Sequence, residues 1–202
     1  MPAPETAAEP AVLSPRRRRL LDAALHVIAD DGLRGLTHRA VDRRAGLPEG
    51  SCSAYLRTRQ ALQAALTEYV ADTLLADVDR LADRLRATGG HEAEGVQAAL
   101  DLFLQWLEQR ELLVARLELT MAATRDPDLS AILADHRARL VEIVGSIMAA
   151  VGKEHSAARA EALVASYDGI LLAALLKPAA ARAAFLSRSM ELLSSGLAGG
   201  PG

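Results

Sequence analysis

The sequence predicts an all-α protein, and three observations lead to this prediction. Half of the 202 residues are apolar, most of these are Ala or Leu, and aromatic residues make up only 3%. Apolar residues recur at spacings of three and four along most of the chain, as they do on the buried face of a helix. Pro and Gly gather at intervals between these segments, where helices begin and end. Such a composition favours helices over a sheet.

The segment from Leu36 to Leu62 predicts a helix-turn-helix. A first short helix is expected over 37–44, with Thr37 as the N-cap, where its hydroxyl can accept a backbone N–H. Gly46 follows, because glycine ends a helix in the left-handed conformation at little cost. A second short helix is expected over 48–56, starting at a proline, where no N–H is needed. Two short helices joined by a glycine-containing turn are typical of a unit whose second helix enters the DNA major groove.

Further helices are expected on both sides of this segment. A first helix is predicted over 15–30 and a long helix over 59–86, whose apolar stripe consists of Leu62, Leu66, Val70, Leu74, Val78, Leu81 and Leu85. Asp126 and Ser156 stand where they can cap two of the later helices. These later helices are expected over 92–109, 110–124, 127–151, 156–176 and 179–196.

This order of helices predicts two domains after a disordered arm. Residues 1–14 contain three Pro without any periodicity, and we expect them to be disordered. Residues 15–62 are expected to form a three-helix DNA-binding domain of the helix-turn-helix type. The long helix then joins it to a helical bundle over 63–202, which is expected to bind a ligand and to dimerise. The last two helices are apolar on more than one face, so a second copy of the chain is the expected cover.

Charge is distributed unevenly between these domains. The net charge of −3 for the whole chain argues against a nucleic-acid binder. Residues 15–62, however, carry ten Arg against five acidic residues, a net charge of +5, while residues 1–14 contribute −2 and the remainder −6. A basic N-terminal third on an acidic body indicates a local anion-binding surface.

The sequence also excludes several classes of protein. The single Cys52 rules out an intrachain disulfide and agrees with a cytoplasmic location. The longest strongly apolar run, over 169–176, is too short to cross a membrane, so a soluble protein is expected. The five His show no ligand spacing with each other or with Cys52, so neither a metal nor another cofactor is expected. No catalytic motif is present, and an all-helical enzyme is therefore disfavoured.

One string of residues resembles a known family. The string AGLPEGSCSAYLRTRQAL over 45–62 is similar to the recognition-helix signature of the TetR family of bacterial transcription regulators, and the similarity extends back over LLDAALHVIADDGLRGLT. It covers about the first 65 residues closely, whereas the rest matches only in helical layout. The resemblance implies a homodimeric regulator, most often a repressor, that binds a pseudo-palindromic DNA operator and an unknown small apolar or aromatic effector. Effector binding would tilt the long helix and so separate the two recognition helices.

The resemblance also assigns roles to residues of the DNA-binding domain. Arg39 is expected to reach a base edge, and Ser51, Ala54 and Tyr55 are expected to face the groove. The start of the long helix is expected to hold a phosphate through basic side chains and helix N-terminal amides. The arginines at the start of the first helix either meet phosphates or form a solvated helix end. The complete set of expected DNA contacts is Arg18, Arg19, Thr37, His38, Arg39, Ser51, Ala54, Tyr55, Arg57, Thr58 and Arg59.

Four residues depart from the family pattern. Ser53 stands where Tyr is frequent, Leu56 replaces a frequent Phe, and Cys52 replaces a usual buried Leu, which predicts a packing role rather than a redox switch. Glu49 is expected to stabilise the first turn of the second short helix rather than accept a hydrogen bond from cytosine. Ser53 and Glu49 are the main support for an alternative function, a helical ligand-binding or protein-interaction module that no longer reads DNA.

The expected ligand pocket lies between the middle helices. Its candidate residues are mostly apolar with a few polar groups, a combination typical of small-molecule sites, although each of them also suits an ordinary core. These candidates are Phe103, Trp106, Leu107, Leu117, Thr120, Met121, Thr124, Ile143 and Tyr167.

Overall fold

The computed structural model describes residues 13–89, 91–153 and 156–198, and within these ranges it contains nine α-helices and no strand. The all-α prediction is therefore confirmed. The predicted disordered arm lies outside the described residues except for Leu13 and Ser14. The helices are α1 (Pro15–Gly35), α2 (His38–Ala45), α3 (Ser51–Tyr55), α4 (Arg59–Thr88), α5 (Glu92–Glu108), α6 (Arg110–Ala123), α7 (Pro127–Ala150), α8 (Ala157–Leu175) and α9 (Ala179–Ala198).

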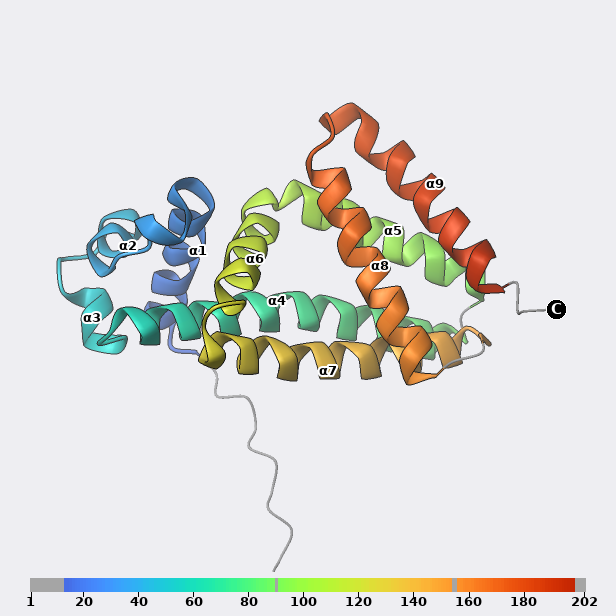
Figure 1. The fold of residues 1–202 in the computed structure, drawn as a ribbon, viewed down its shortest axis with the longest axis horizontal. Helices are drawn as coiled ribbons and strands as arrows, with labels where there is room; N and C mark the ends of the chain where they lie inside the picture. The colour runs from blue at the N-terminus through green and yellow to red at the C-terminus, as the bar shows by residue number, and fades with distance from the viewer. Residues whose placement is uncertain (1–12, 90, 154–155, 199–202) are drawn as a thin grey trace, which may run out of the picture.

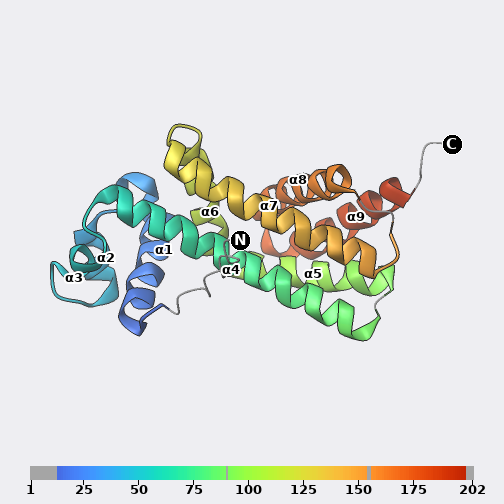
Figure 2. The ribbon, with the colours of Figure 1, turned by 90° about the horizontal axis from the view of Figure 1, so that it is seen from below.

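The helices form an elongated molecule with α1, α2 and α3 at one end (Figure 1). Helix α4 begins at this end and runs along the molecule, and α7 lies beside it, as the view from below also shows (Figure 2). Helices α5, α8 and α9 lie at the other end. Helix α6 packs against α1, α4 and α7. Both α4 and α6 therefore connect the helix-turn-helix end to the bundle.

Helix α4 is built as the sequence predicts. It spans 30 residues, about 45 Å at the usual rise of an α-helix. Thr58 caps its N-terminus by accepting the Ala61 N–H, and Gly89, at φ 63°, ends it in the left-handed conformation. Every residue of the predicted apolar stripe is buried. The stripe holds α4 against α1 at one end and against the bundle at the other.

One predicted boundary is wrong. The second short helix begins at Ser51 and not at Pro48, because Pro48 and Glu49 belong to a turn in which the Ser51 N–H donates to the Pro48 carbonyl at 3.1 Å. Gly50 follows with φ 91°, a conformation that a helix excludes and that glycine adopts easily. The recognition helix is consequently only five residues long.

The other predicted boundaries agree with the structure to within a few residues. Helix α1 contains a break at Gly32, φ 67°, close to its predicted end, and then continues for one more short turn. Thr37, Asp126 and Ser156 accept backbone N–H groups as N-caps of α2, α7 and α8, which confirms their predicted capping roles. None of the described helices has the length and hydropathy needed to cross a membrane.

Candidate nucleic-acid interface and ligand cavity

Helix α3 is held at its N-terminus by the carboxylate of Asp42, which comes from α2. Asp42 is only 1% exposed, and its two oxygens accept the backbone N–H groups of Gly50 at 2.8 Å and Cys52 at 2.7 Å. These donors lie at the start of α3, where helix N–H groups lack partners and the helix dipole favours a negative charge. Because so short a helix has little stability alone, Asp42 fixes the position of α3 on α2.

His38 holds the other end of the same helix. Its Nε2 donates to the carbonyl oxygen of Leu56, the residue after α3, at 2.5 Å. Between these two attachments Cys52 and Leu56 are buried in the core, which confirms the predicted packing role of Cys52. Burial and the nearby charge of Asp42 raise the pKa of the Cys52 thiol to about 11. The thiol therefore stays protonated at neutral pH, a form that reacts poorly.

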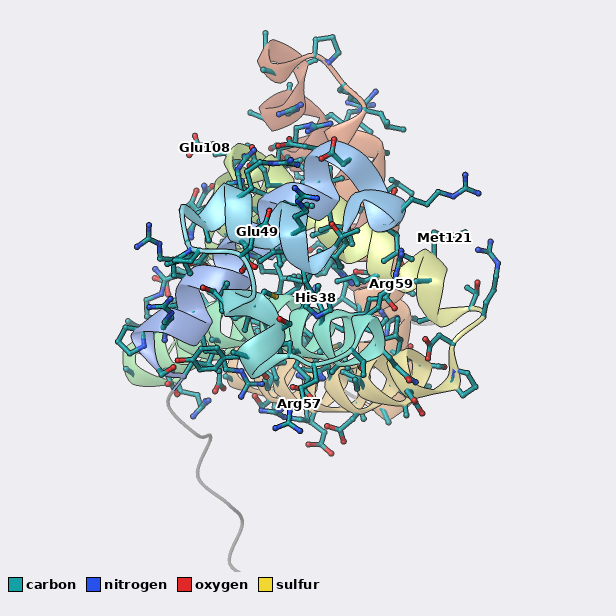
Figure 3. All side chains as sticks on the ribbon, turned by 90° about the vertical axis from the view of Figure 1, so that its left-hand side faces the viewer. His38, Glu49, Arg57, Arg59, Glu108 and Met121 are labelled. Carbon is teal, nitrogen blue, oxygen red and sulfur yellow. The ribbon has the colours of Figure 1, made fainter. Side chains whose placement is uncertain are left out.

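Outside these attachments, the end of the molecule presents polar side chains to solvent (Figure 3). Ala54 and Tyr55 of α3 are exposed, and Ser51 is half-buried. Arg39 of α2 is exposed as well, and its Nε lies 2.9 Å from Oε1 of Glu49. Three of the predicted DNA-contacting residues, Arg39, Ala54 and Tyr55, are therefore exposed in α2 and α3.

Other predicted contacts have partners inside the protein. Thr37 and Thr58 are engaged as helix caps, and His38 is engaged by the Leu56 carbonyl. Nη2 of Arg59 donates to the carbonyl oxygen of Leu33 at 2.8 Å. Arg57 is exposed and, among the described residues, has no hydrogen-bond or ion-pair partner. Of the two arginines expected to hold a phosphate at the start of α4, Arg57 is therefore the one without an internal partner.

The arginines at the start of α1 lie close to the helix-turn-helix. Nη2 of Arg16 donates to Oγ of Ser51 at 3.2 Å, and the guanidinium of Arg19 lies beside Gly46 in the turn between α2 and α3. Arg18 and Arg19 are exposed. This arrangement places positive charge next to the exposed side of α3, as the segmental charge predicts.

The backbone of a single residue, Leu33, connects this end of the molecule with both α6 and α4. The Leu33 N–H donates to Oε2 of Glu118 on α6 at 3.1 Å, while the Leu33 carbonyl accepts from Arg59 at the start of α4. Gly32, directly before it, faces the same Glu118 carboxylate. A displacement of α6 or α4 therefore acts directly on the end of α1.

A cavity of about 580 Å³ lies in the bundle, lined mainly by residues from α4 to α8, with Ser194 of α9 at its wall. Its largest side chains are Phe103 and Trp106 of α5, whose rings stack with centroids 5.6 Å apart, and Tyr167 of α8, which meets Phe103 edge to face at 5.0 Å. The Trp106 Nε1–H donates to the buried carboxylate of Asp77 at 2.7 Å. The volume and the mostly apolar wall suit a drug-sized molecule.

The predicted pocket residues fall into two groups. Five of the nine line the cavity, namely Phe103, Trp106, Thr120, Thr124 and Tyr167. The structure does not place the other four on its wall, namely Leu107, Leu117, Met121 and Ile143. On α6 the predicted side is displaced by about one residue: Arg116, Leu119 and Thr120 face the cavity, whereas Met121 is 57% exposed. Leu107 is buried in the core beside the cavity.

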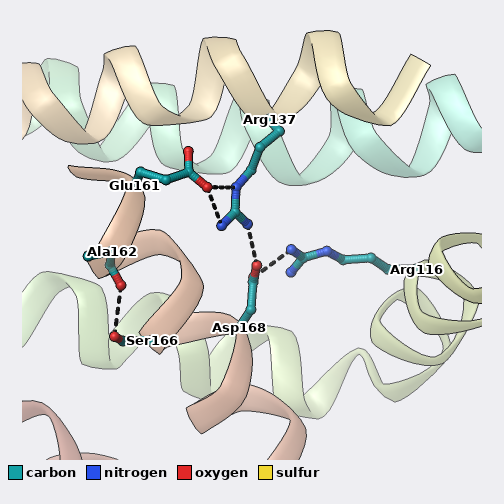
Figure 4. A network of polar contacts seen from close by, with 6 residues as sticks. All are labelled: Arg116, Arg137, Glu161, Ala162, Ser166 and Asp168. Carbon is teal, nitrogen blue, oxygen red and sulfur yellow. Dashed lines mark hydrogen bonds and ion pairs between the residues drawn. The ribbon is translucent and has the colours of Figure 1, made fainter. Parts of the chain in front are cut away.

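A charged network crosses one side of the cavity (Figure 4). Arg116 of α6 and Arg137 of α7 each place a guanidinium nitrogen 2.5 Å from a different oxygen of Asp168 on α8. Arg137 also pairs with Glu161 at 2.9 Å. Burial alone lowers the pKa of Arg137, but its hydrogen bonds with Asp168 and Glu161 raise it above the usual value. The network joins three helices through side-chain contacts alone.

Asp42, Arg116, Arg137 and Asp168 are site residues that the apolar patterns do not single out. A signal for two of them is present in the sequence. Asp42 directly follows the buried Val41, and Arg116 follows the buried Ala115, so each charge stands next to the inner stripe of its helix. A charged residue at such a position needs a partner, and searching for these positions would have identified both.

The last two helices expose large apolar side chains. Leu172 and Leu176 near the end of α8 are 43% and 81% exposed, and Leu192 of α9 is 62% exposed. Both helices belong to the bundle and lie away from the helix-turn-helix (Figure 1). In the described part of the chain, no group of His, Cys, Asp and Glu is arranged to hold a metal ion.

Comparison with known proteins gives consistent matches. Residues 90–193 match the family model described as "Tetracyclin repressor-like, C-terminal domain". None of the curated proteins matches the sequence.

Solved structures match nearly the whole chain. A TetR family member from Streptomyces coelicolor A3 is 29% identical, with 87% of this chain and 98% of that chain covered and a TM-score of 0.64. The multidrug binding protein EbrR complexed with ethidium is 30% identical, with 87% and 98% covered and a TM-score of 0.60, and EbrR is also solved with proflavin and malachite green. A transcriptional regulator from Rhodococcus sp. Rha1, at 23% identity, covers 91% of this chain and 96% of its own with a TM-score of 0.76.

Proposed function

The chain belongs to the TetR family of transcriptional regulators, and we propose that it is a repressor released from its DNA operator by a small-molecule effector. The observation that carries this proposal is that α4 and α6 each contribute to the cavity wall and also bond to the backbone of Leu33 at the DNA-binding end. A molecule in the cavity therefore contacts the same helices that hold the end of α1 in the DNA-binding domain.

In this proposal α3 enters the major groove of DNA. Ser51, Ala54 and Tyr55 face the bases, Arg39 reaches a base edge, and Arg57, Arg18 and Arg19 neutralise phosphates. The rigid attachment of α3 by Asp42 and His38 supports this role, because a reading helix must keep one orientation. It also argues against the alternative of a module that no longer reads DNA, since that module has no need of a fixed and exposed α3.

The proposed functional unit is a homodimer formed through α8 and α9. The exposed Leu172, Leu176 and Leu192 support it, because monomeric proteins seldom leave such side chains uncovered together. Two copies of α3 would then match the two halves of a pseudo-palindromic operator. Light scattering tests this interface. Leu176→Glu is expected to yield monomers, and Met121→Glu, at an exposed apolar position on α6, is expected to leave the dimer intact.

The proposed effector is a small molecule with an apolar or aromatic body. EbrR complexed with ethidium or proflavin supports this choice, as does the aromatic cluster of Phe103, Trp106 and Tyr167 in the cavity wall. The effector would release DNA by binding more tightly to an arrangement in which α4 and α6 have moved the two recognition helices out of register.

Titration of the full-length protein with DNA fragments from around its own gene tests the proposed function. We expect specific binding to one fragment at moderate salt, measured by fluorescence anisotropy, with a random-sequence duplex of the same length as the control. Binding that is equal for both duplexes would contradict the DNA-reading role. If a specific fragment is found, an aromatic compound that shifts the fluorescence of Trp106, the only tryptophan, should also release that fragment.

A further inference from the structure

Positive charge exceeds negative charge on the wall of the cavity. Arg116 and Arg137 line it, whereas Asp168 is the one carboxylate among the described lining residues. Three other carboxylates bond to groups on the wall but lie outside it. The buried Asp77 accepts from Trp106 and also pairs with Arg80. Glu161 pairs with Arg137 and Asp72 with His136, and these two carboxylates are 54% and 62% exposed. Water screens charges at such exposed positions more than charges inside the cavity.

The charged groups on the wall also leave more hydrogen-bond donors than acceptors unused. Both oxygens of Asp168 already accept from a guanidinium, one from Arg116 and one from Arg137. A guanidinium carries five N–H donors, and only one hydrogen bond is formed by Arg116 with the described residues.

The hydroxyl of Tyr167 adds a second donor. It makes no hydrogen bond with any described residue, and burial raises the pKa of Tyr167 to about 12, so the hydroxyl keeps its proton at neutral pH. The cavity therefore offers unused donors, while its one carboxylate is already engaged.

We infer that the effector is an apolar or aromatic carboxylic acid, bound with its body against Phe103 and Trp106 and its carboxylate at the unused N–H groups of Arg116. This inference rests on the proposed function, because it names the chemical class that the effector cavity accepts. A carboxylate matches the planar guanidinium with two parallel hydrogen bonds. A cation meets the opposite situation, because Arg116 and Arg137 repel it and Asp168 is already paired.

The test uses three probes with one body and different charges: phenyloctanoate, phenyloctanamide and phenyloctylammonium. Their binding to the full-length protein is measured by calorimetry and by the fluorescence of Trp106. We expect phenyloctanoate to bind at least about tenfold more tightly than the neutral amide, and the cation to bind most weakly. Equal affinity of the acid and the amide, or tighter binding of the cation, would overturn the inference without any variant being made.

Variants then test the role of Arg116. Arg116→Gln should lower the affinity for phenyloctanoate to that for the amide, and Arg116→Lys, which keeps the charge but not the planar group, should have an intermediate effect. Arg125→Gln is the matched control, since Arg125 is exposed and does not line the cavity. Retention of the full preference for the acid in Arg116→Gln would overturn the assignment to this residue.

Failure of the inference and failure of the proposed function give different results. If the amide binds and releases operator DNA as well as the acid does, the inference is wrong and the regulator remains. If none of the three probes binds, the effector part of the proposed function and the inference are both contradicted, while DNA binding is judged from the operator titration alone.

Discussion

The two ends of this molecule use their polar and charged side chains in different ways. At the DNA-binding end, Asp42, His38, Arg59 and Glu118 all bind backbone groups of neighbouring segments. Around the cavity, Arg116, Arg137, Asp168 and Glu161 bind one another. The first arrangement fixes the path of the chain, whereas the second joins helices through side chains that have other rotamers available.

This difference suits the two proposed roles. Backbone groups held by buried carboxylates cannot exchange partners with solvent, so the recognition helix keeps one position before it meets DNA. The side chains of a network beside a cavity can adopt other rotamers when a ligand enters. Loss of a single charge is therefore expected to lower the free energy of unfolding more at the DNA-binding end than at the cavity end.

The largest effect is expected for Asp42→Ala. The substitution leaves the buried N–H of Cys52 and the partly buried N–H of Gly50 without their acceptor, and we expect a loss of about 3 kcal/mol in the free energy of unfolding. Urea denaturation followed by circular dichroism measures it. Asp30→Ala is the control, because Asp30 forms only an exposed ion pair with Arg44 and should change stability by less than about 1 kcal/mol. Equal losses would show that the Asp42 hydrogen bonds do not fix α3.

A smaller effect is expected at the cavity end for Asp168→Asn. It removes the shared partner of Arg116 and Arg137, which are only partly buried, and should destabilise the protein by about 1–2 kcal/mol. It should also increase the affinity for phenyloctanoate, because loss of the negative charge of Asp168 strengthens the attraction of Arg116 and Arg137 for the carboxylate. Asp83→Asn, in an exposed pair with Arg86, is the control and should change neither quantity. If Asp168→Asn lowered the free energy of unfolding as much as Asp42→Ala, the proposed difference between the two ends would be wrong.

The pH dependence of stability tests whether the thiol of Cys52 is buried in the DNA-binding end. Its pKa is raised from 9.0 to about 11 in the folded protein, so stability is fully present below pH 9 and falls as the unfolded thiol ionises above it. At pH 10 this amounts to a loss of about 1 kcal/mol. Cys52→Ala should lose less stability between pH 8 and pH 10 than the wild type by this amount. Identical pH profiles would show that the thiol is not buried in this way.

Much of the fold follows from periodicity and capping, while the site follows only in part. The stripe of α4 and the caps Thr37, Asp126 and Ser156 are local signals, and each appears in the structure as predicted. The position at which α3 begins is not given by a local signal, because it depends on a hydrogen-bond acceptor, Asp42, that belongs to another helix.

The cavity shows the same limit. Apolar spacing identifies the core-facing side of α5 and so finds Phe103 and Trp106, but it cannot separate the cavity-facing side of α6 from the neighbouring rows. Met121 was placed in the pocket for this reason, although it faces solvent. The network of Arg116, Arg137 and Asp168 joins residues from three helices, and its geometry depends on how those helices pack.

The smallest effect on stability is expected for the exposed ion pair of Arg39 and Glu49. Glu49→Gln should change the free energy of unfolding by less than about 0.5 kcal/mol, because water solvates both side chains in the wild type. It should nevertheless tighten binding to a random-sequence duplex by about threefold at low salt, since a negative charge is removed beside the phosphates. Arg39→Ala should weaken the same binding, and both are measured by anisotropy over a range of KCl concentrations. If neither variant changes DNA affinity, this pair lies outside the DNA-contacting surface. The proposed DNA contacts are then limited to α3, the arginines of α1 and Arg57.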